Sequence, residues 1–372
     1  MNLKFLPLFI IATILFTGCK TKNHDLAKKD GKTGATKIVD KIHYKEEKHL
    51  KNIKQLTFGG DNAEAYWSFD DNKLVFQASN HWGVKCDQIF IYDLKHPLTD
   101  DKTIPQMVST GKGRTTCSYF MPGDSTIVYS STHLVDPNCP PVPKKEDHGG
   151  KYVWPIYDSF DIFVADLKGN IKKQLTNTPG YDAEPTVSPK GDLIVFTSMR
   201  SGDLELYTMK LDGNDVKQVT NQLGYDGGAF FSPDGTKLIF RASRPKTEAE
   251  IKEYKDLLAD GLVMPTHMEL YICNVDGSDL KKITDLGSAN WAPFFHPSGK
   301  KVIFSSNHKT KTVPFNLYMI NVDGTGLEQI TYDKVFDAFP MFSNDGKKLI
   351  FSSNRNNHGT KDTNLFVADW VD

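Results

Sequence analysis

The sequence lacks the features that mark several common functional classes. Its charges nearly cancel, with 45 Lys and Arg against 46 Asp and Glu, and its apolar run at residues 5–16 is too short to span a bilayer. Five cysteines are present but no Cys-x-x-Cys pair, which argues against a zinc site of that type. There is no Gly-x-Ser-x-Gly nucleophile elbow, and the glycine-rich stretch 111–116 lacks the spacing of a phosphate-binding loop.

What the chain does contain is a repeat, seen most clearly in LTNTPGYDAEPTVSPKGDLIVFTSMRSGDLELYTMKLDGNDVKQV at 175–219. Alternating or continuous apolar positions, separated by turn residues, predict four strands at 184–188, 193–198, 204–210 and 216–220. Four antiparallel strands in about 45 residues are typical of one blade of a β-propeller.

Copies of this unit are recognised by a turn that is followed by an aromatic residue. The aromatic residue stands eight positions after the first residue of the turn, which we call the marker. The pairs are Ser68 and Phe76, Met121 and Tyr129, Ser188 and Phe196, Ser232 and Phe240, His296 and Phe304, and Ser343 and Phe351. A Leu-Thr or similar dipeptide closes most copies, as at Leu175-Thr176 and Val219-Thr220. Six copies predict six blades, all in one domain spanning 51–372.

These motifs resemble the TolB-like β-propeller repeat family, and the resemblance covers residues 50–370. It implies an all-β fold of four-stranded antiparallel blades but no particular activity, because propellers host unrelated functions. The sixth copy stops after its third strand, at 364–370, while a spare fourth-strand pattern occurs at 53–57. We therefore predict that this N-terminal strand completes the last blade and closes the ring.

The N-terminus reads as a lipoprotein signal. Lys4 precedes the apolar run, and Thr17-Gly18-Cys19 resembles a lipobox, so residues 1–19 are predicted to be removed and Cys19 to carry lipid. Residues 20–50 are predicted to form a flexible tether. From Lys20 to Lys54 the net charge is about +6, against about −8 for the remaining propeller. This favours an envelope protein anchored to a membrane, facing the periplasm or the outer-membrane surface, and argues against nucleic-acid binding.

The cysteines carry one open question. Cys86, Cys117 and Cys139 fall in the first two blades, and one disulfide is expected among them, but the sequence does not say which pair forms. Cys273 is predicted to lie in the core.

Two loop positions recur in every blade and open on the same predicted face. Six positions before the marker stand Asn62, Thr115, Asp182, Asp226, Asn290 and Asp337; twelve after it stand Asn80, His133, Arg200, Arg244, His308 and Arg355. Wherever the first column has Asp, the second has Arg. We predict structural ion pairs that join the two loops of three blades: Asp182–Arg200, Asp226–Arg244 and Asp337–Arg355.

His133 and His308 break this pattern, since each faces a neutral residue, and they are binding candidates. They belong to opposite blades, which argues against one shared metal ion, so no metal or other cofactor is expected, although a divalent ion stays open. Solvated loop histidines are the plain alternative. Glu64 and Glu184 stand two positions after the first column and are expected to face the channel. Nothing in the sequence shows whether they approach closely enough for acid–base chemistry.

Insertions at 134–160 and 245–266 decorate the same face. The second is predicted to contain a helix, with a Thr247–Glu250 capping box and a stop at Gly261. Its apolar stripe is predicted to be Ala249, Ile251, Leu257 and Leu258. The aromatics of this face either stack on a ligand or pack the insertions onto the rim. The binding candidates are His133, His308, Asn290, Trp291, Glu64, Glu184 and Trp154.

The sequence thus favours a lipid-anchored, monomeric envelope propeller that binds a protein or an envelope glycan on its loop-rich face without catalysis. One alternative is a metal-dependent carbohydrate-active enzyme, since oligogalacturonate lyases look broadly similar. Another is a surface glycan-capture protein of an uptake system. The identity of the ligand and the membrane leaflet are not readable from the chain.

Overall fold

The computed structural model describes residues 41–372. The predicted signal peptide, the predicted lipidation site Cys19 and most of the predicted tether lie outside the described residues. Residues 41–372 belong to one compact unit. Within 41–372 no helix has the length and apolarity needed to cross a membrane.

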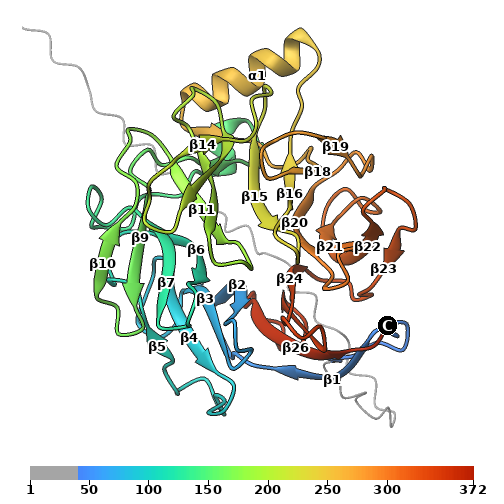
Figure 1. Cartoon of the computed structure of the whole chain (residues 1–372). Helices are drawn as coiled ribbons and strands as arrows, with labels where there is room; N and C mark the ends of the chain where they lie inside the picture. The colour runs from blue at the N-terminus through green and yellow to red at the C-terminus, as the bar shows by residue number, and fades with distance from the viewer. Residues whose placement is uncertain (1–40) are drawn as a thin grey trace, which may run out of the picture. The chain divides into compact units, whose positions relative to one another are not determined.

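Six four-stranded antiparallel sheets surround a central axis (Figure 1). The innermost strands are β2 (Asp61–Trp67), β6 (Thr115–Phe120), β11 (Asp182–Val187), β15 (Asp226–Phe231), β20 (Asn290–Phe295) and β24 (Asp337–Phe342). The second strands are β3 (Lys73–Ser79), β7 (Thr126–Ser131), β12 (Leu193–Ser198), β16 (Lys237–Ala242), β21 (Lys301–Ser306) and β25 (Lys348–Ser353). The third strands are β4 (Gln88–Asp93), β9 (Asp161–Asp166), β13 (Glu205–Lys210), β18 (Glu269–Asn274), β22 (Asn316–Asn321) and β26 (Asn364–Trp370). The outer strands are β5 (Gln106–Met107), β10 (Ile171–Gln174), β14 (Lys217–Gln218), β19 (Lys281–Lys282), β23 (Glu328–Gln329) and β1 (Leu50–Gln55).

The last blade is closed by the N-terminal strand, as predicted. β1 pairs antiparallel with β26, with Leu50 opposite Trp370 and Gln55 opposite Phe366. The strand begins three residues earlier than the sequence pattern indicated. This pairing covers an edge of the sixth sheet that would otherwise be exposed, and it joins the two ends of the described chain.

The repeated aromatic residue is the centre of each blade. All six of these side chains are completely buried: Phe76, Tyr129, Phe196, Phe240, Phe304 and Phe351. Burying a side chain of this size contributes about 1.5–3 kcal/mol relative to leaving it exposed. The repeat in the sequence is therefore a repeat of core positions, which confirms the six-bladed interpretation.

The Leu-Thr signal has a hydrogen-bonding cause. In five blades the threonine hydroxyl accepts a backbone N–H from the third strand, as between Leu206 and Thr220 at 2.9 Å. In the first blade Ser109 takes this role and accepts from Ile89 at 2.9 Å. These bonds satisfy a buried donor where the outer strand is only two to four residues long or has just ended.

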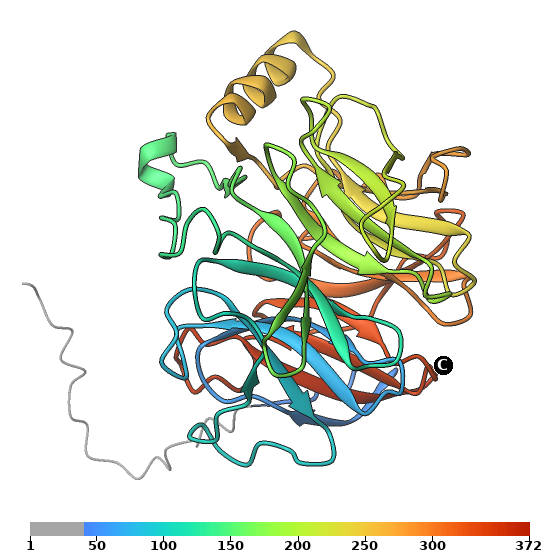
Figure 2. The same ribbon diagram turned by 60° about the vertical axis from the view of Figure 1, so that its left-hand side comes forward.

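The two insertions meet. The first contains the short 3-10 helix η1 (Lys145–His148) and β8 (Trp154–Pro155); the second contains helix α1 (Glu248–Ala259) and β17 (Leu262–Val263). β8 pairs antiparallel with β17, which makes a small separate sheet. Figure 2 shows α1 and the η1 segment projecting on the same side of the propeller. We call this side the loop face, because it also carries the loops between second and third strands.

Helix α1 begins with the predicted capping box, in which Thr247 accepts from the Glu250 N–H and Glu250 accepts from the Thr247 N–H. The predicted apolar stripe was wrong in part. The buried residue of the helix is Tyr254, whose hydroxyl donates to Asp203, whereas Ala249 is exposed. A tyrosine can bury its ring and still reach a polar partner, so it anchors the helix where a purely aliphatic stripe was expected.

The structure also differs from the prediction at the end of the tether. Residues up to 50 were expected to be flexible, but Glu47 and Leu50 are each 1 % exposed. The Glu47 carboxylate reaches a buried arginine of the last blade, so the last part of the expected tether belongs to the folded propeller.

Candidate channel site

Every innermost strand carries an irregularity at the same place. The register shifts in all six, for example between Ala183 and Thr186, because of a β-bulge. The bulged residue has a positive φ, between 43° and 60°, in each blade. These residues, which we call the channel ring, are Glu64, Cys117, Glu184, Gly228, Ala292 and Phe339.

A second set of polar residues lies beside the ring. Each belongs to the second strand of a blade. There it pairs with the residue that precedes the channel-ring residue of the same blade. This set, the support ring, consists of Gln77, Ser130, Thr197, Arg241, Ser305 and Ser352. Four of its members bond to channel-ring residues, as when Ser305 accepts from the Phe339 N–H at 3.1 Å. The channel is therefore polar at this level.

Glu184 and Arg241 form the best-connected part of the site. The Arg241 guanidinium donates to Glu184 Oε1 and, at 2.7 Å, to the Tyr225 hydroxyl. The Tyr225 hydroxyl donates to Glu184 at 2.9 Å, and Thr197 donates to the other carboxylate oxygen at 2.7 Å. Burial alone would raise the pKa of Glu184, but Arg241 and these hydrogen bonds outweigh it and lower the pKa.

Two glycines make room for this ion pair. A Cβ on Gly228 would lie 1.7 Å from Arg241 Nη1, and one on Gly227 would lie 2.5 Å from Glu184 Oε2. The N–H of Gly228 donates to Glu184 at 2.9 Å. Arg241 therefore enters the channel only because the fourth blade has Gly-Gly where other blades carry side chains.

Glu64 has a different environment. It accepts a hydrogen bond from the thiol of Cys117, at 3.0 Å, and both residues are partly exposed. Burial raises the pKa of Glu64. The hydrogen bond from the Cys117 thiol lowers it, but the effect of burial is larger. Burial and the nearby Glu64 raise the pKa of the Cys117 thiol well above its ordinary value, so a neutral thiol donates to the carboxylate. Glu64 and Cys117 are therefore partly exposed and still strongly affected by burial.

The Asp–Arg columns form ion pairs on the loop face. Arg200 donates to both oxygens of Asp182 at 3.0 Å, Arg244 contacts both oxygens of Asp226, and Arg355 donates to Asp337 at 2.9 Å. All three aspartates are buried.

The histidines occupy the arginine position in their blades. His133 bonds to Ser131 at 2.9 Å, and its ring lies 4.6 Å from that of Phe163; His308 bonds to Ser306 at 3.1 Å, and its ring lies 4.5 Å from that of Tyr318. Arg200 and Arg244 similarly lie over Tyr207 and Tyr271, each at 5.0 Å. Burial lowers the pKa of both histidines. The two rings pack on the blades as the arginines do and are not brought together.

Asn290 and the tryptophans also make internal contacts. Asn290 is completely buried, and its amide donates to the Met268 carbonyl at 2.8 Å. Trp291 donates to the Pro265 carbonyl at 2.8 Å and stacks on Phe315. Trp154 of β8 packs against Trp291 and lies over Arg241, 5.4 Å from its guanidinium. These contacts favour the packing alternative for the aromatics, with Trp154 covering part of the channel mouth.

The sequence reasoning missed a second buried arginine cluster. Arg355 contacts not only Asp337 but also both oxygens of Glu47, at 3.1 and 3.3 Å, and Asp333, at 3.1 Å. All four side chains are 1 % exposed or less. Burial, followed by the charge of Asp337, raises the pKa of Asp333 to about 7. The acid-rich segment before β24 was a visible signal, but Glu47 lies 308 residues from its partner.

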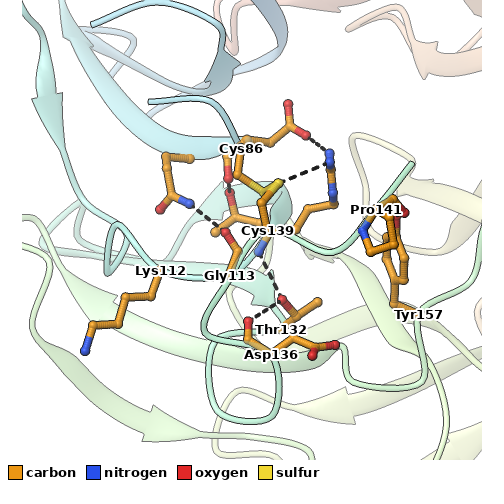
Figure 3. Close-up of a disulfide and its surroundings, with 12 residues drawn as sticks. Cys86, Lys112, Gly113, Thr132, Asp136, Cys139, Pro141 and Tyr157 are labelled. Carbon is orange, nitrogen blue, oxygen red and sulfur yellow. Dashed lines mark hydrogen bonds and ion pairs between the residues drawn. A yellow bond between two sulfur atoms is a disulfide. The ribbon is translucent and has the colours of Figure 1, made fainter. Parts of the chain in front are cut away.

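A disulfide fixes the first insertion to the neighbouring blade. Cys86, just before β4, is bonded to Cys139, and this answers the pairing left open by the sequence (Figure 3). Nearby, Tyr157 donates to the Pro141 carbonyl at 2.6 Å and Thr132 donates to the Asp136 carbonyl at 3.2 Å. Cys273 is buried as predicted, and Cys117 is a free thiol.

No metal centre is evident in the part of the chain that the structure describes. Across residues 41–372 no three His, Cys, Asp or Glu side chains form a group that could hold a metal ion. Glu64 and Glu184 share the ring with Cys117 between them, but Glu184 is committed to Arg241.

Comparison with known proteins gives family and fold. The family model of the TolB beta propeller domain matches residues 155–260 and 263–361, more than half of the chain. A TolB-type protein from Agrobacterium tumefaciens is similar in structure, with a TM-score of 0.53 and 19 % identity over 84 % of this chain and 91 % of that one.

TolB from Acinetobacter baumannii has a TM-score of 0.50 and 19 % identity, over 84 % of this chain and 64 % of that one. An oligogalacturonate lyase in complex with manganese has a TM-score of 0.50 and 14 % identity, over 86 % of this chain and 93 % of that one. No curated protein matches the sequence.

Proposed function

Because the chain belongs to the TolB beta propeller domain family, we propose that it is a non-catalytic binding protein of the bacterial cell envelope. Its partner is a protein or an envelope glycan, bound on the loop face. Cys19 carries a lipid that holds the protein to a membrane, and the basic tether links that anchor to the propeller.

The loop face is the observation that carries this proposal. It holds the partly exposed mouth of a polar channel and two insertions that are fixed by a disulfide, a small sheet and an aromatic cluster. Leu134, Val135 and Val142 of the first insertion nevertheless remain exposed. Rigid loops that display apolar side chains beside a polar cavity suit recognition, because little conformational entropy is lost on binding.

The compartment is supported by the disulfide between Cys86 and Cys139, since such bonds persist in oxidising surroundings outside the cytoplasm. The relatives with similar folds include TolB proteins of two bacteria. An envelope location is therefore consistent with both the cysteine chemistry and the family.

The enzyme alternative receives less support. The similar lyase holds manganese, but among residues 41–372 of this chain no three His, Cys, Asp or Glu side chains form a group that could hold a metal ion, and His133 and His308 pack on separate blades. Stoichiometric manganese or zinc in the purified protein, lost in His133→Ala, would instead favour the enzyme.

The proposal is tested by affinity capture from solubilised native envelopes with the full chain as bait. We expect the double variant Val135→Asp/Val142→Asp to lose the captured partner. Ile104→Asp is the matched control: Ile104 is 64 % exposed, against 68 % and 59 % for the two valines, but lies outside both insertions, in the segment between β4 and β5. Equal recovery with both variants, or no partner above an empty resin, would contradict the proposal.

A further inference from the structure

We propose that the channel ring binds a primary ammonium group on an alkyl stem, as in a lysine side chain of a protein partner, with Glu64 as its counter-charge. This inference rests on the proposed function and specifies what the loop face recognises. It is carried by the juxtaposition of an unpaired carboxyl, unpartnered buried hydroxyls and an apolar mouth.

The first observation is the contrast between the two ring glutamates. Glu184 receives hydrogen bonds from Arg241, Tyr225, Thr197 and the Gly228 N–H, so its carboxylate is saturated. Glu64 receives one from the Cys117 thiol, and within residues 41–372 no Lys, Arg or His forms an ion pair with it. One carboxyl of the ring therefore has free acceptor capacity and no cation in direct contact, since Arg241 acts on it only from a distance.

The second observation concerns the support ring. Ser130 and Ser352 are completely buried, and their hydroxyls have no hydrogen-bond partner within the described protein. The equivalent residues in the four other blades all contact channel-ring atoms, which places these two hydroxyls beside the ring as well. Buried hydroxyls are rarely left without a partner, and an ammonium has three donors and no acceptor.

Charge decides between a cation and an anion. Arg241 is neutralised by Glu184 in direct contact, so the remaining charge of the ring is that of Glu64. An incoming anion would meet Glu64 without a free positive charge to offset it. An incoming ammonium supplies the missing counter-charge and favours the ionised carboxylate, although burial opposes it.

Apolar members of the same ring suit an alkyl stem. Ala292 and Phe339 of the channel ring are partly exposed, and Trp154 lies over Arg241. A lysine stem can lie along such apolar surface while its ammonium reaches the Glu64 carboxylate. An aromatic wall adds cation–π attraction to the carboxylate contact.

The test measures binding of Nα-acetyl-lysine methylamide to the full chain by saturation-transfer NMR titration. Nα-acetyl-norleucine methylamide, which has a similar stem but no amine, is the matched probe. We expect the lysine probe to bind at least about tenfold more tightly to the wild type, corresponding to about 1.4 kcal/mol. In Glu64→Gln this preference should fall below about twofold.

Glu248→Gln, an exposed acid on α1, is the control and should keep the full preference. Thermal unfolding of each variant verifies that it is folded, and Glu64→Asp, which shortens the side chain but keeps the charge, should retain part of the preference. Equal binding of the two probes to the wild type, or an unchanged preference in Glu64→Gln, would overturn the inference. Envelope capture that persists in Glu64→Gln would leave the proposed function intact while the ammonium site fails.

Discussion

The two buried arginines of the propeller, Arg355 and Arg241, show two ways in which a repeat acquires an ionic centre. Arg355 stands at a repeated arginine position and pairs with the aspartate expected of its blade, then gathers Glu47 and Asp333 as additional partners. Arg241 stands where the other blades have a small or neutral polar residue, and it requires two adjacent glycines to fit.

The two arginines serve different parts of the propeller: Arg355 holds the closed last blade together, and Arg241 lies in the channel. Three carboxylates surround Arg355, so the cluster is over-supplied with negative charge and fixes the segment before β1 to the last blade. Arg241 pairs with one carboxylate, that of Glu184, so their charges cancel and Glu64 carries the remaining charge of the channel ring. We therefore expect changes at Arg355 to affect stability, and changes around Arg241 to affect both stability and the shape of the channel.

The largest effect is expected for Arg355→Ala. Removal of the guanidinium leaves Glu47, Asp333 and Asp337 buried without compensation, and breaking such a cluster destabilises by about 3–5 kcal/mol. The free energy of unfolding, measured with urea, should fall by that amount, and amide exchange should accelerate first in β1 and β26. Arg200→Ala is the control: Arg200 faces a single aspartate and is more exposed, so its loss should be smaller. Equal losses would mean that the additional carboxylates do not matter.

Gly228→Ala should have the next largest effect, about 2–4 kcal/mol. The new Cβ would overlap Arg241 Nη1 and force the guanidinium away from Glu184, at a backbone position with φ of 60°. Gly299→Ala isolates the backbone contribution, because its φ is 69° but the nearest atom to its Cβ is 3.9 Å away. If the two alanine variants lose the same free energy of unfolding, the packing of Arg241 against Gly228 contributes nothing.

Asp333→Asn should change the pH dependence of stability. Folded Asp333 has a pKa of about 7, above its ordinary value of 3.8, so between these values the folded state holds a proton that the unfolded state has released. Stability from this group is therefore lost as pH rises from about 4 to about 7.

The free energy of unfolding of Asp333→Asn relative to the wild type should accordingly rise by about 2.5 kcal/mol between pH 5 and pH 8. Glu205 and Asp226, whose pKa values burial also raises, are present in both proteins, so the difference isolates Asp333. A constant difference across this range would contradict the assignment.

Arg355 and Arg241 also differ in how well the sequence predicts their surroundings. Blade number, the closing strand and the loop ion pairs were predictable, because each rests on a motif repeated in register, such as Asp182 with Arg200. Arg241 was in principle detectable as the one charged residue of the support ring. Recognising it requires knowing that Gly227 and Gly228 replace side chains in the same blade.

Other contacts could not be predicted because they join segments without a repeated pattern. Glu47 was assigned to the tether from its charged surroundings, and only the fold brings it to Arg355. The β8–β17 sheet consists of two-residue strands, too short for any periodicity. Trp154 and Trp291 were equally compatible with ligand stacking and internal packing until their mutual contact was seen.

The smallest effect, and the only stabilising one, is expected at the channel ring of the fifth blade. Ala292 holds the position equivalent to Gly228, with φ of 48°, a conformation that an L-residue adopts at a penalty. Ala292→Gly relieves this strain but gives the unfolded chain more freedom, so we expect a net gain of about 0.5 kcal/mol in the free energy of unfolding. Ala63→Gly, at a partly exposed position of β2 without positive φ, should instead destabilise by about 1 kcal/mol. Opposite signs of the change in the free energy of unfolding for the two variants would mean that the bulge imposes the left-handed conformation on whichever residue occupies it. Gly228 in the fourth blade would then both relieve this strain and make room for Arg241. A loss in both variants would show that the side chain of Ala292 stabilises the ring more than its backbone strains it.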